Sequence, residues 1–235
     1  MSSVHPILSA DNTASDTNAP DVGDRLKITE IFYSLQGEAR TIGWPTTFIR
    51  LTGCPLRCRY CDTAYAFTGG EWMSLDQILE RAAQYQTRFI TVTGGEPLAQ
   101  KRCILLLSKL CDAGYTVSLE TSGAIDISQV DPRVSRVVDI KTPASDEQDK
   151  NHWPNLGYLT SHDQVKFVIT DRNDFDWSTS VVQQYNLSDT CEVLFSPVYE
   201  QLPPAQLADW IVDAQLPVRF QVQLHKLLWN DEPGR

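Results

Sequence analysis

The stretch from Gly53 to Thr63 reads Gly-Cys-Pro-Leu-Arg-Cys-Arg-Tyr-Cys-Asp-Thr and places Cys54, Cys58 and Cys61 within eight residues. Three thiols this close in sequence suit either a metal site or a disulfide-forming loop. The chain has six cysteines and a polar start unlike a secretory leader, so we expect a reducing compartment, the cytoplasm, and free thiols. The stretch therefore predicts a metal centre around which the rest of the chain is organised.

The kind of metal follows from the number of ligands. Structural zinc takes four protein ligands, whereas an iron–sulfur cluster is held by cysteine thiolates and can keep one iron open. No fourth Cys or His stands near the three thiols in the sequence. Cys103 and Cys111 lie in a leucine-rich helical segment and Cys191 in an apolar strand, where free Cys packs as a small hydrophobic residue. We therefore expect an iron–sulfur cluster, with a zinc site as the alternative.

Composition limits the remaining possibilities. The chain has 235 residues, 42% of them hydrophobic, which is enough for one sizeable core. Its formal charge of -10 argues against direct nucleic-acid binding, which needs clustered Lys and Arg, and no apolar run approaches the length of a membrane span. Residues 1–24 contain four Asp and no Lys or Arg, so we expect a disordered tail followed by one catalytic domain at 25–235.

Strand and helix patterns alternate along this domain. Strands are expected at 28–35, 47–51, 89–93, 115–120, 134–140, 165–170 and 193–195, and helices at 75–85, 100–112, 174–186 and 204–214, the first of them capped by Ser74. Such alternation predicts right-handed parallel βα units, and six or so units are too few for a closed eight-fold barrel. We expect an open partial (β/α)6-type barrel in a single domain, with its active site at the C-terminal ends of the strands.

A second motif, Thr93-Gly94-Gly95-Glu96-Pro97, follows one of these strands. Glycines without a Cβ let the backbone approach another group closely, although a βα turn before a helix-starting Pro would read the same way. With the three cysteines upstream, the motif predicts a binding turn at the cluster.

The spacing C-x3-C-x2-C, with Tyr60 before the last Cys, resembles the radical S-adenosylmethionine superfamily. This resemblance implies a [4Fe-4S] cluster whose open iron chelates S-adenosylmethionine, which is cleaved to methionine and a 5′-deoxyadenosyl radical. It also implies that Gly95 and Glu96 hold the amino group of this cofactor, and that Glu120 and Ser122 belong to a further cofactor contact.

A narrower resemblance covers nearly all of the predicted domain. Leu35-Gln36-Gly37-Glu38, Phe48-Ile49-Arg50-Leu51, Cys61-Asp62-Thr63, Asp139-Ile140-Lys141-Thr142-Pro143 and Gln223-Leu224-His225-Lys226 resemble the 7-carboxy-7-deazaguanine synthase family. The resemblance implies conversion of 6-carboxy-5,6,7,8-tetrahydropterin to 7-carboxy-7-deazaguanine, with ring contraction and loss of ammonia, on the route to queuosine. It also implies Mg²⁺, a homodimer, and an electron donor such as flavodoxin or ferredoxin.

The family assigns roles to individual positions. The implied cofactor contacts are Tyr60, Cys61, Asp62, Gly95, Glu96, Glu120, Ser122, Asp139, Ile140, Lys141, Ser196, Pro197, Val198 and Tyr199. The implied substrate contacts are Leu35, Gln36, Gly37, Glu38, Arg50, Thr93 and His225, and Thr63 is the implied Mg²⁺ ligand. The family commonly has Ser-Pro-Lys where this chain has Asp139-Ile140-Lys141, so the role of Asp139 is open.

Two other functions share part of this pattern. An activase that installs a glycyl radical on a partner protein uses the same cysteine spacing and a small open barrel, but it gives no reason for Gln36-Gly37-Glu38 or His225. A non-catalytic zinc or iron–sulfur module would need only the cysteines. Conversion of the pterin distinguishes the synthase from both.

Overall fold

The computed structural model describes residues 24–230, 232 and 234. The disordered tail predicted for residues 1–24 lies outside the described residues except for Asp24, which forms an ion pair with Arg102 at 3.3 Å. The domain is thus ordered from its first described residue.

Strands and helices alternate as the sequence predicts. The strands are β1 (Arg25–Leu35), β2 (Pro45–Leu51), β3 (Glu71–Ser74), β4 (Phe89–Gly94), β5 (Thr116–Thr121), β6 (Ser135–Asp139), β7 (Gln164–Ile169), β8 (Glu192–Pro197) and β9 (Arg219–Phe220). The helices are α1 (Leu75–Ala82), α2 (Cys103–Asp112), α3 (Arg172–Gln184), α4 (Leu187–Thr190), α5 (Pro204–Asp213) and α6 (Leu224–Trp229). Short 3-10 turns lie at Ala64–Phe67, Pro97–Ala99, Pro143–Ser145, Gln148–Lys150 and Trp153–Tyr158.

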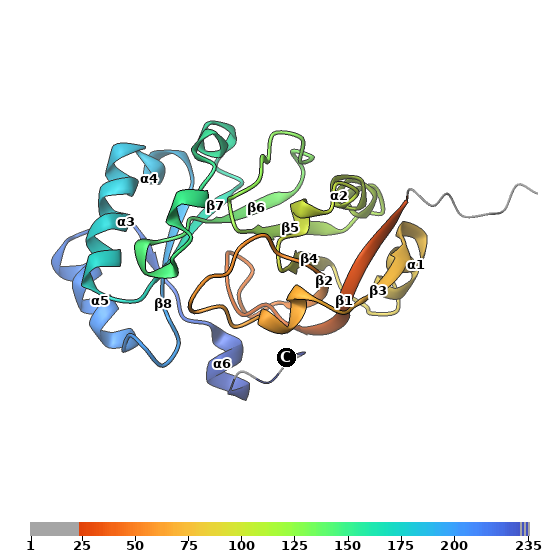
Figure 1. The fold of residues 1–235 in the computed structure, drawn as a ribbon, viewed down its shortest axis with the longest axis horizontal. Helices are drawn as coiled ribbons and strands as arrows, with labels where there is room; N and C mark the ends of the chain where they lie inside the picture. Colours follow the sequence, from red (N-terminus) through yellow and green to blue (C-terminus); the bar gives the residue numbers. More distant parts are fainter. Residues whose placement is uncertain (1–23, 231, 233, 235) are drawn as a thin grey trace, which may run out of the picture.

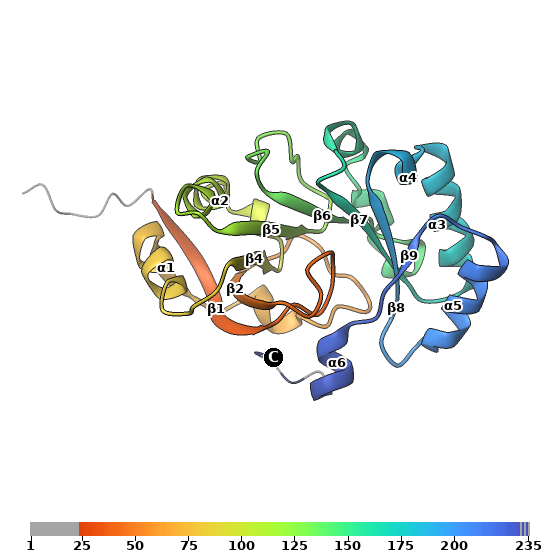
Figure 2. The same cartoon turned by 180° about the vertical axis from the view of Figure 1, so that it is seen from behind.

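The described strands form one sheet in the order β3-β1-β2-β4-β5-β6-β7-β8-β9. Every neighbouring pair from β2 to β9 is parallel. The sheet curves without closing, and helices α1, α2, α3 and α5 cover its outer side (Figures 1 and 2). The expected open partial barrel is confirmed. All parallel strands therefore carry their C-terminal ends to the same edge.

Two edge strands depart from the parallel pattern. β1 pairs antiparallel with both β2 and β3, and residues 36–44 join β1 to β2. This connection is too short for a parallel crossover, which needs a dozen or more residues. The predicted strand at 28–35 is correct, but it opens the sheet as a hairpin rather than as a βα unit.

The C-terminal part was incompletely predicted. No strand or helix was predicted after residue 214, whereas the structure forms β9 and then α6. α6 has six residues and no side-chain cap at its N-terminus, so it carries little local signal. It lies on the inner side of the curved sheet, near the segment that follows β2 (Figure 2).

Helix α1 illustrates a local prediction that is confirmed. The backbone N–H of Gln77 donates to Ser74 Oγ at 3.2 Å, and Gln77 Oε1 accepts from the Ser74 N–H at 2.8 Å. This reciprocal capping box starts the helix. Ile78 and Ala82 then point into a hydrophobic core that runs from β1 to α5.

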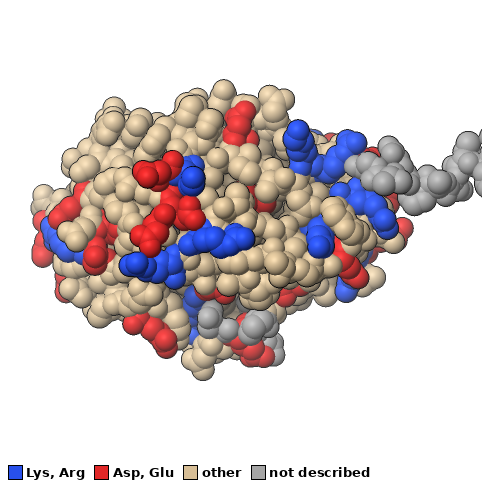
Figure 3. Space-filling view, viewed as in Figure 1, with Lys and Arg blue, Asp and Glu red and all other residues tan. Residues whose placement is uncertain are grey.

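None of the helices in the described part of the chain is long and apolar enough to cross a membrane. On the face drawn in Figure 3, basic side chains are interspersed with acidic ones on most of the surface, and they gather mainly toward the side of α1 and α2. This face lacks the continuous basic surface that binding to a phosphate backbone requires.

Candidate active site

A cavity of about 500 Å³ opens at the C-terminal ends of the parallel strands. Its wall is formed by the cysteine loop after β2, the ends of β4 to β7, the turn after β1 and the start of α6. The cavity lies where a barrel of parallel strands places its chemistry. Sequence motifs from separate segments of the chain therefore meet in one space.

The three cysteines of the loop line this cavity and are half-buried. The pKa of the Cys58 thiol is raised to about 11, chiefly by burial; Lys141 lowers it, and Asp139 and the thiols of Cys61 and Cys54 raise it by smaller amounts. Such thiols must lose their protons on binding metal. All three sulfur-bearing side chains line the same cavity.

Cys54, Cys58 and Cys61 are the cysteines that line the cavity among the described residues. Cysteine thiolates are the usual ligands of iron–sulfur clusters. Cys103 and Cys191 are buried elsewhere, and Cys111 packs partly against the core. Cys191 precedes β8 instead of lying within it, but its packing role is as expected.

Two glycines bring the end of β4 against the cysteine loop. A Cβ on Gly94, whose φ is +157°, would lie 2.4 Å from the carbonyl oxygen of Leu51. A Cβ on Gly95 would lie 2.3 Å from the carbonyl oxygen of Gly53 and 2.8 Å from Cys54 Cβ. Only glycine fits at such distances. The sequence motif thus marks a close backbone approach.

Glu96 lies behind the cavity wall with no exposed surface. Its carboxylate accepts from the Ser122 N–H at 2.7 Å, from Thr121 Oγ1 at 2.9 Å and from the Leu98 N–H at 2.9 Å. These bonds join the end of β4 to the end of β5. The structure places Glu96 as a brace for Ser122, which does line the cavity.

Other implied cofactor contacts separate into two groups. Tyr60, Asp62, Asp139, Lys141, Val198 and Tyr199 line the cavity. Ile140 packs in the hydrophobic core, and Ser196 and Pro197 are buried at the end of β8. Ser196 Oγ and Asp139 Oδ1 are buried without a hydrogen-bond partner among the described residues. Of these two oxygens, the one on Asp139 belongs to a residue that lines the cavity.

Gln36 ties the turn after β1 to β4 and β5. It is 2% exposed, and its Nε2 donates to Thr91 Oγ1 at 3.0 Å and to Glu120 Oε1 at 3.2 Å. Thr93 Oγ1 donates to the other oxygen of Glu120 at 3.0 Å. Glu120, implied as a cofactor contact, therefore lies among the implied substrate contacts.

Glu38 is held by two residues to which the sequence analysis assigned no role. Lys166 Nζ lies 2.6 Å from Glu38 Oε2, and Gln223 Nε2 donates to Glu38 Oε1 at 2.7 Å. Burial raises the pKa of Glu38, but Lys166 and Gln223 outweigh it and the net shift is downward. Burial and the Glu38 charge raise the pKa of Glu120. The two carboxyls are pushed toward different protonation states.

The turn after β1 packs tightly against α6. A Cβ on Gly37 would lie 2.1 Å from His225 Nδ1, and the Leu224 N–H donates to the Gly37 carbonyl at 3.0 Å. Gly37 thus allows His225 to reach the cavity, which it lines together with Leu35. The C-terminal segment completes the wall.

Arg50, on β2, also lines the cavity. Its Nε pairs with Glu30 at 2.7 Å, and Tyr65 Oη donates to the same carboxylate oxygen at 2.8 Å. The guanidinium carbon lies 5.8 Å from the ring centroid of Phe32 and 5.7 Å from that of Tyr65. These contacts hold the guanidinium at the cavity wall. The ion pair with Glu30 uses Nε and not the two terminal nitrogens of the guanidinium.

The cysteine loop ends in a second network tied to α6. Thr63 Oγ1 donates to Asp62 Oδ1 at 2.8 Å, and Lys226 Nζ lies 2.8 Å from Asp62 Oδ2. Burial raises the pKa of Asp62, but Lys226 outweighs it and lowers the pKa well below its usual range. Lys226 also lies 5.2 Å from the Tyr199 ring centroid. Asp62 is therefore ionised beside Thr63.

Sequence analysis assigned no role to Lys166, Gln223 or Lys226, all of which line the cavity, although the last two stand in the motif around His225. One signal was available: Lys166 interrupts the otherwise apolar run Val165 to Ile169 within the strand predicted at 165–170. A buried lysine needs partners. The other two lie in a segment whose fold was not predicted.

Comparisons with known proteins agree with this geometry. A family model described as the radical SAM superfamily matches residues 48–137. The chain is 42% identical to the 7-carboxy-7-deazaguanine synthase of Chlorobaculum tepidum over 210 residues, covering 88% of this chain and 96% of the relative. It is 39% identical to that of Koribacter versatilis over 222 residues, covering 88% and 98%.

A solved structure supports the fold. The crystal structure of QueE from Escherichia coli superposes with a TM-score of 0.72 at 22% identity, covering 86% of this chain and 95% of that one. At this identity the likeness concerns the fold alone. Together with the similarity over nearly the whole of its curated relatives, it leads to one conclusion: the chain belongs to the 7-carboxy-7-deazaguanine synthase family of the radical SAM superfamily.

Proposed function

We propose that the protein carries out the reaction of its family in this cavity, converting 6-carboxy-5,6,7,8-tetrahydropterin to 7-carboxy-7-deazaguanine with loss of ammonia. The observation that carries the proposal is the meeting of the Gln36 turn, Arg50, Thr63 and His225 with the cysteine loop in one cavity. A cluster-binding module or an activase gives no reason for this convergence. The pathway is then that of queuosine and related 7-deazapurines.

The cysteine side of the cavity suits the cofactors of the superfamily. Cys54, Cys58 and Cys61 would hold the [4Fe-4S] cluster, and Gly95 would lie beside the cofactor because it packs directly on the loop. When bound, the cluster and S-adenosylmethionine supply the electron and the 5′-deoxyadenosyl radical that start the reaction. Asp139, which lines the cavity, has an oxygen without a hydrogen-bond partner among the described residues and could accept a hydrogen bond from the cofactor.

The opposite side suits the amine and amide edge of a pterin. Glu38, kept ionised by Lys166, can accept from an amine, and the Gly37 backbone lies next to it. Glu120 has a raised pKa, so it can hold a proton or accept one as charge on the substrate changes. Gln36 is fully engaged with the protein, and its part is to fix this frame.

The substrate carboxylate is assigned to Arg50. The Nε–H is taken by Glu30, which leaves the terminal nitrogens to form the planar fork that suits a carboxylate. His225, on the C-terminal side of the cavity, would face the bound substrate.

Magnesium is assigned to Thr63. Mg²⁺ binds through few protein oxygens and keeps several waters, so one hydroxyl beside an ionised carboxylate is a suitable site. Thr63 Oγ1 donates its proton to Asp62, which leaves the lone pairs of the hydroxyl oxygen to bind the ion. Asp62 would then contact the water shell of the ion.

The remaining assignments concern partners and location. All six cysteines are free thiols, which supports a reducing compartment and thus the cytoplasm. The electron donor would be a carrier such as flavodoxin or ferredoxin, meeting the protein where Arg57 and Arg59 are exposed beside the cluster ligands. A homodimer is part of the proposal, and light scattering tests it.

An anaerobic assay tests the reaction itself. Reconstituted protein with reductant, S-adenosylmethionine and Mg²⁺ is expected to convert the pterin, release ammonia and use the cofactor catalytically. Deuterium at C6 of the pterin should then appear in 5′-deoxyadenosine or in recovered cofactor. Cofactor cleavage with the pterin left intact, accompanied by a glycyl radical on a partner polypeptide, would replace the synthase with the activase.

A further inference from the structure

Lys166 contacts a residue from each side of the cavity. Its Nζ lies 2.6 Å from Glu38 Oε2 on the substrate side and 3.5 Å from Asp139 Oδ2 on the cofactor side. Its side chain is 13% exposed, so both contacts are shielded from water. Lys166 is not among the residues assigned above to contact the substrate, the cofactor or the metal ion.

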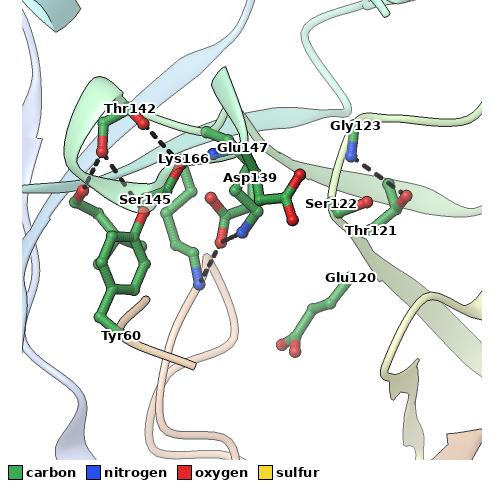
Figure 4. Close-up of polar contacts among 12 residues, drawn as sticks. Tyr60, Glu120, Thr121, Ser122, Gly123, Asp139, Thr142, Ser145, Glu147 and Lys166 are labelled. Carbon is green, nitrogen blue, oxygen red and sulfur yellow. Dashed lines mark hydrogen bonds and ion pairs between the residues drawn. The ribbon is translucent and has the colours of Figure 1, made fainter. Parts of the chain in front are cut away.

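The sheet places Lys166 there by register. In the parallel pair of β6 and β7, Lys166 lies opposite Asp139, so the two side chains project from the same face of the sheet into the cavity. Figure 4 shows Lys166 reaching Asp139 while Glu120 points from β5 toward the same space. Lys141 Nζ approaches the same oxygen of Asp139 at 3.1 Å. Glu38, Lys166, Asp139 and Lys141 therefore form a row of alternating charge.

Lys166 also separates two acidic groups. Glu38 and Glu120 interact unfavourably, since the Glu38 charge raises the pKa of Glu120 and the positive charge of Lys166 opposes this effect. Without Lys166, the Glu38 carboxylate would keep the uncharged amide of Gln223, at 2.7 Å, and the influence of His225, which lowers its pKa less than Lys166 does. An ionised, buried carboxylate with so little compensation takes up a proton or turns toward water.

We propose that Lys166 is a positioning residue that holds Glu38 charged and in place for the pterin amine, and that ties this carboxylate to the Asp139–Lys141 pair on the cofactor side. The inference rests on the proposed function. Substrate and cofactor are then held by one connected row of charges. Loss of Lys166 should weaken substrate binding and let the cofactor be cleaved without product.

The first test is binding of 6-carboxypterin, an oxidised analogue, to reconstituted, unreduced protein by calorimetry. Lys166→Met is expected to weaken binding about tenfold or more, because Glu38 loses its charged partner. Lys166→Arg keeps the charge and should recover part of the loss. Lys109→Met, which removes a surface ion pair to Asp76 at 3.7 Å, is the matched control and should bind as the parent does.

A double variant separates positioning from direct contact and from misfolding. Glu38→Gln with Lys166→Met removes both charges, and Asp139 keeps Lys141 at 3.1 Å. If Lys166 acts through Glu38, the double variant binds the analogue as well as Glu38→Gln alone. If the two losses multiply, Lys166 contacts the ligand itself and the inference is overturned. The double variant decides the question even where Lys166→Met does not fold.

Turnover gives a second readout. The ratio of 5′-deoxyadenosine to product is expected to rise in Lys166→Met and to stay at the parent value in Lys109→Met. A folded Lys166→Met protein with parental affinity and parental ratio would refute the inference. If the parent neither binds the analogue nor converts the pterin, the proposed function fails instead.

Discussion

The two sides of the cavity are built differently. On the cofactor side, backbone meets backbone: Gly95 lies where a Cβ would clash with the Gly53 carbonyl, and the Glu96 N–H donates to that carbonyl at 2.8 Å. On the substrate side, side chains meet across the fold: Glu38 is held by Lys166 and Gln223, which are 128 and 185 residues away in sequence. The first side depends on shape, and the second on charge and hydrogen bonding.

This difference predicts two kinds of response to substitution. A close backbone approach leaves no room for one extra carbon, so a change there should disrupt the cluster loop as a unit. A network of side chains can lose one member and keep the rest, so changes there should be graded. The predictions below test that contrast, from the largest expected effect to the smallest.

The largest effect is expected from Cys58→Ala. Because the described loop offers no spare thiol, loss of one ligand should abolish cluster assembly and all turnover. Iron content and the visible absorption of reconstituted protein measure this. Cys111→Ala, in a half-buried thiol on α2, should leave both unchanged. Normal iron content in Cys58→Ala would place the cluster ligands elsewhere.

Gly95→Ala should come next. The added Cβ would meet the Gly53 carbonyl oxygen at 2.3 Å and Cys54 Cβ at 2.8 Å, and neither atom can swing aside as a side-chain tip could. We expect reduced iron content and a stability loss of about 1 to 3 kcal/mol, measured by thermal unfolding.

Gly157→Ala is the matched control for this change, because nothing lies within 4 Å of the added Cβ. It should leave iron content and unfolding unchanged. Equal behaviour of the two variants would show that the close approach of Gly95 to the cysteine loop is unimportant for the cluster.

The same contrast explains what the sequence could predict. Cys54 to Cys61 and Gly94-Gly95 are short, contiguous patterns whose chemistry is local, so the cluster loop, the binding turn and the open barrel were all expected. The antiparallel β1 hairpin was not, because a strand pattern does not state its direction. Lys166 and Lys226 find their partners only through strand register and the packing of α6, which no local pattern contains.

Glu96 shows that a recognised motif does not by itself predict the contacts of its side chains. Its identity and its place after two glycines are local, but the use of its carboxylate depends on β5. In the structure, the Glu96 carboxylate accepts hydrogen bonds from Thr121, Ser122 and Leu98, and these bonds stabilise the wall of the cavity. A motif therefore predicts where a residue lies more reliably than what its side chain contacts.

Gly37→Ala tests the substrate side at its tightest point. The added Cβ would lie 2.1 Å from His225 Nδ1, so the His225 ring must move. Because the obstacle is a side chain on α6 and not the cluster loop, we expect normal iron content with a raised KM for the pterin. Steady-state kinetics and iron analysis of the same preparation measure the two effects. Loss of iron in this variant would remove the distinction between the two sides.

Arg50→Lys is a graded change on the same side. The charge stays, but the planar fork that suits a carboxylate is lost. We expect weaker pterin binding by about 1 to 3 kcal/mol, as for loss of a charge-assisted hydrogen bond. Cofactor cleavage without product should persist, since the cysteine loop is untouched. Unchanged affinity by calorimetry would exclude a contact between Arg50 and the substrate carboxylate.

Thr63→Ala should give the smallest effect. Thr63 connects the two sides of the cavity, because it ends the cysteine loop and its hydroxyl contacts Asp62, which belongs to the network on the substrate side. Mg²⁺ keeps several waters in such sites, so loss of one hydroxyl ligand should weaken ion binding without abolishing it. We expect slow turnover at limiting Mg²⁺, recovery at high Mg²⁺ and normal iron content. Thr68→Ala, after the 3-10 turn Ala64–Phe67, is the control and should keep the parental Mg²⁺ dependence. If Thr63→Ala also keeps it, the ion binds elsewhere, and Thr63 serves only to orient Asp62 toward Lys226.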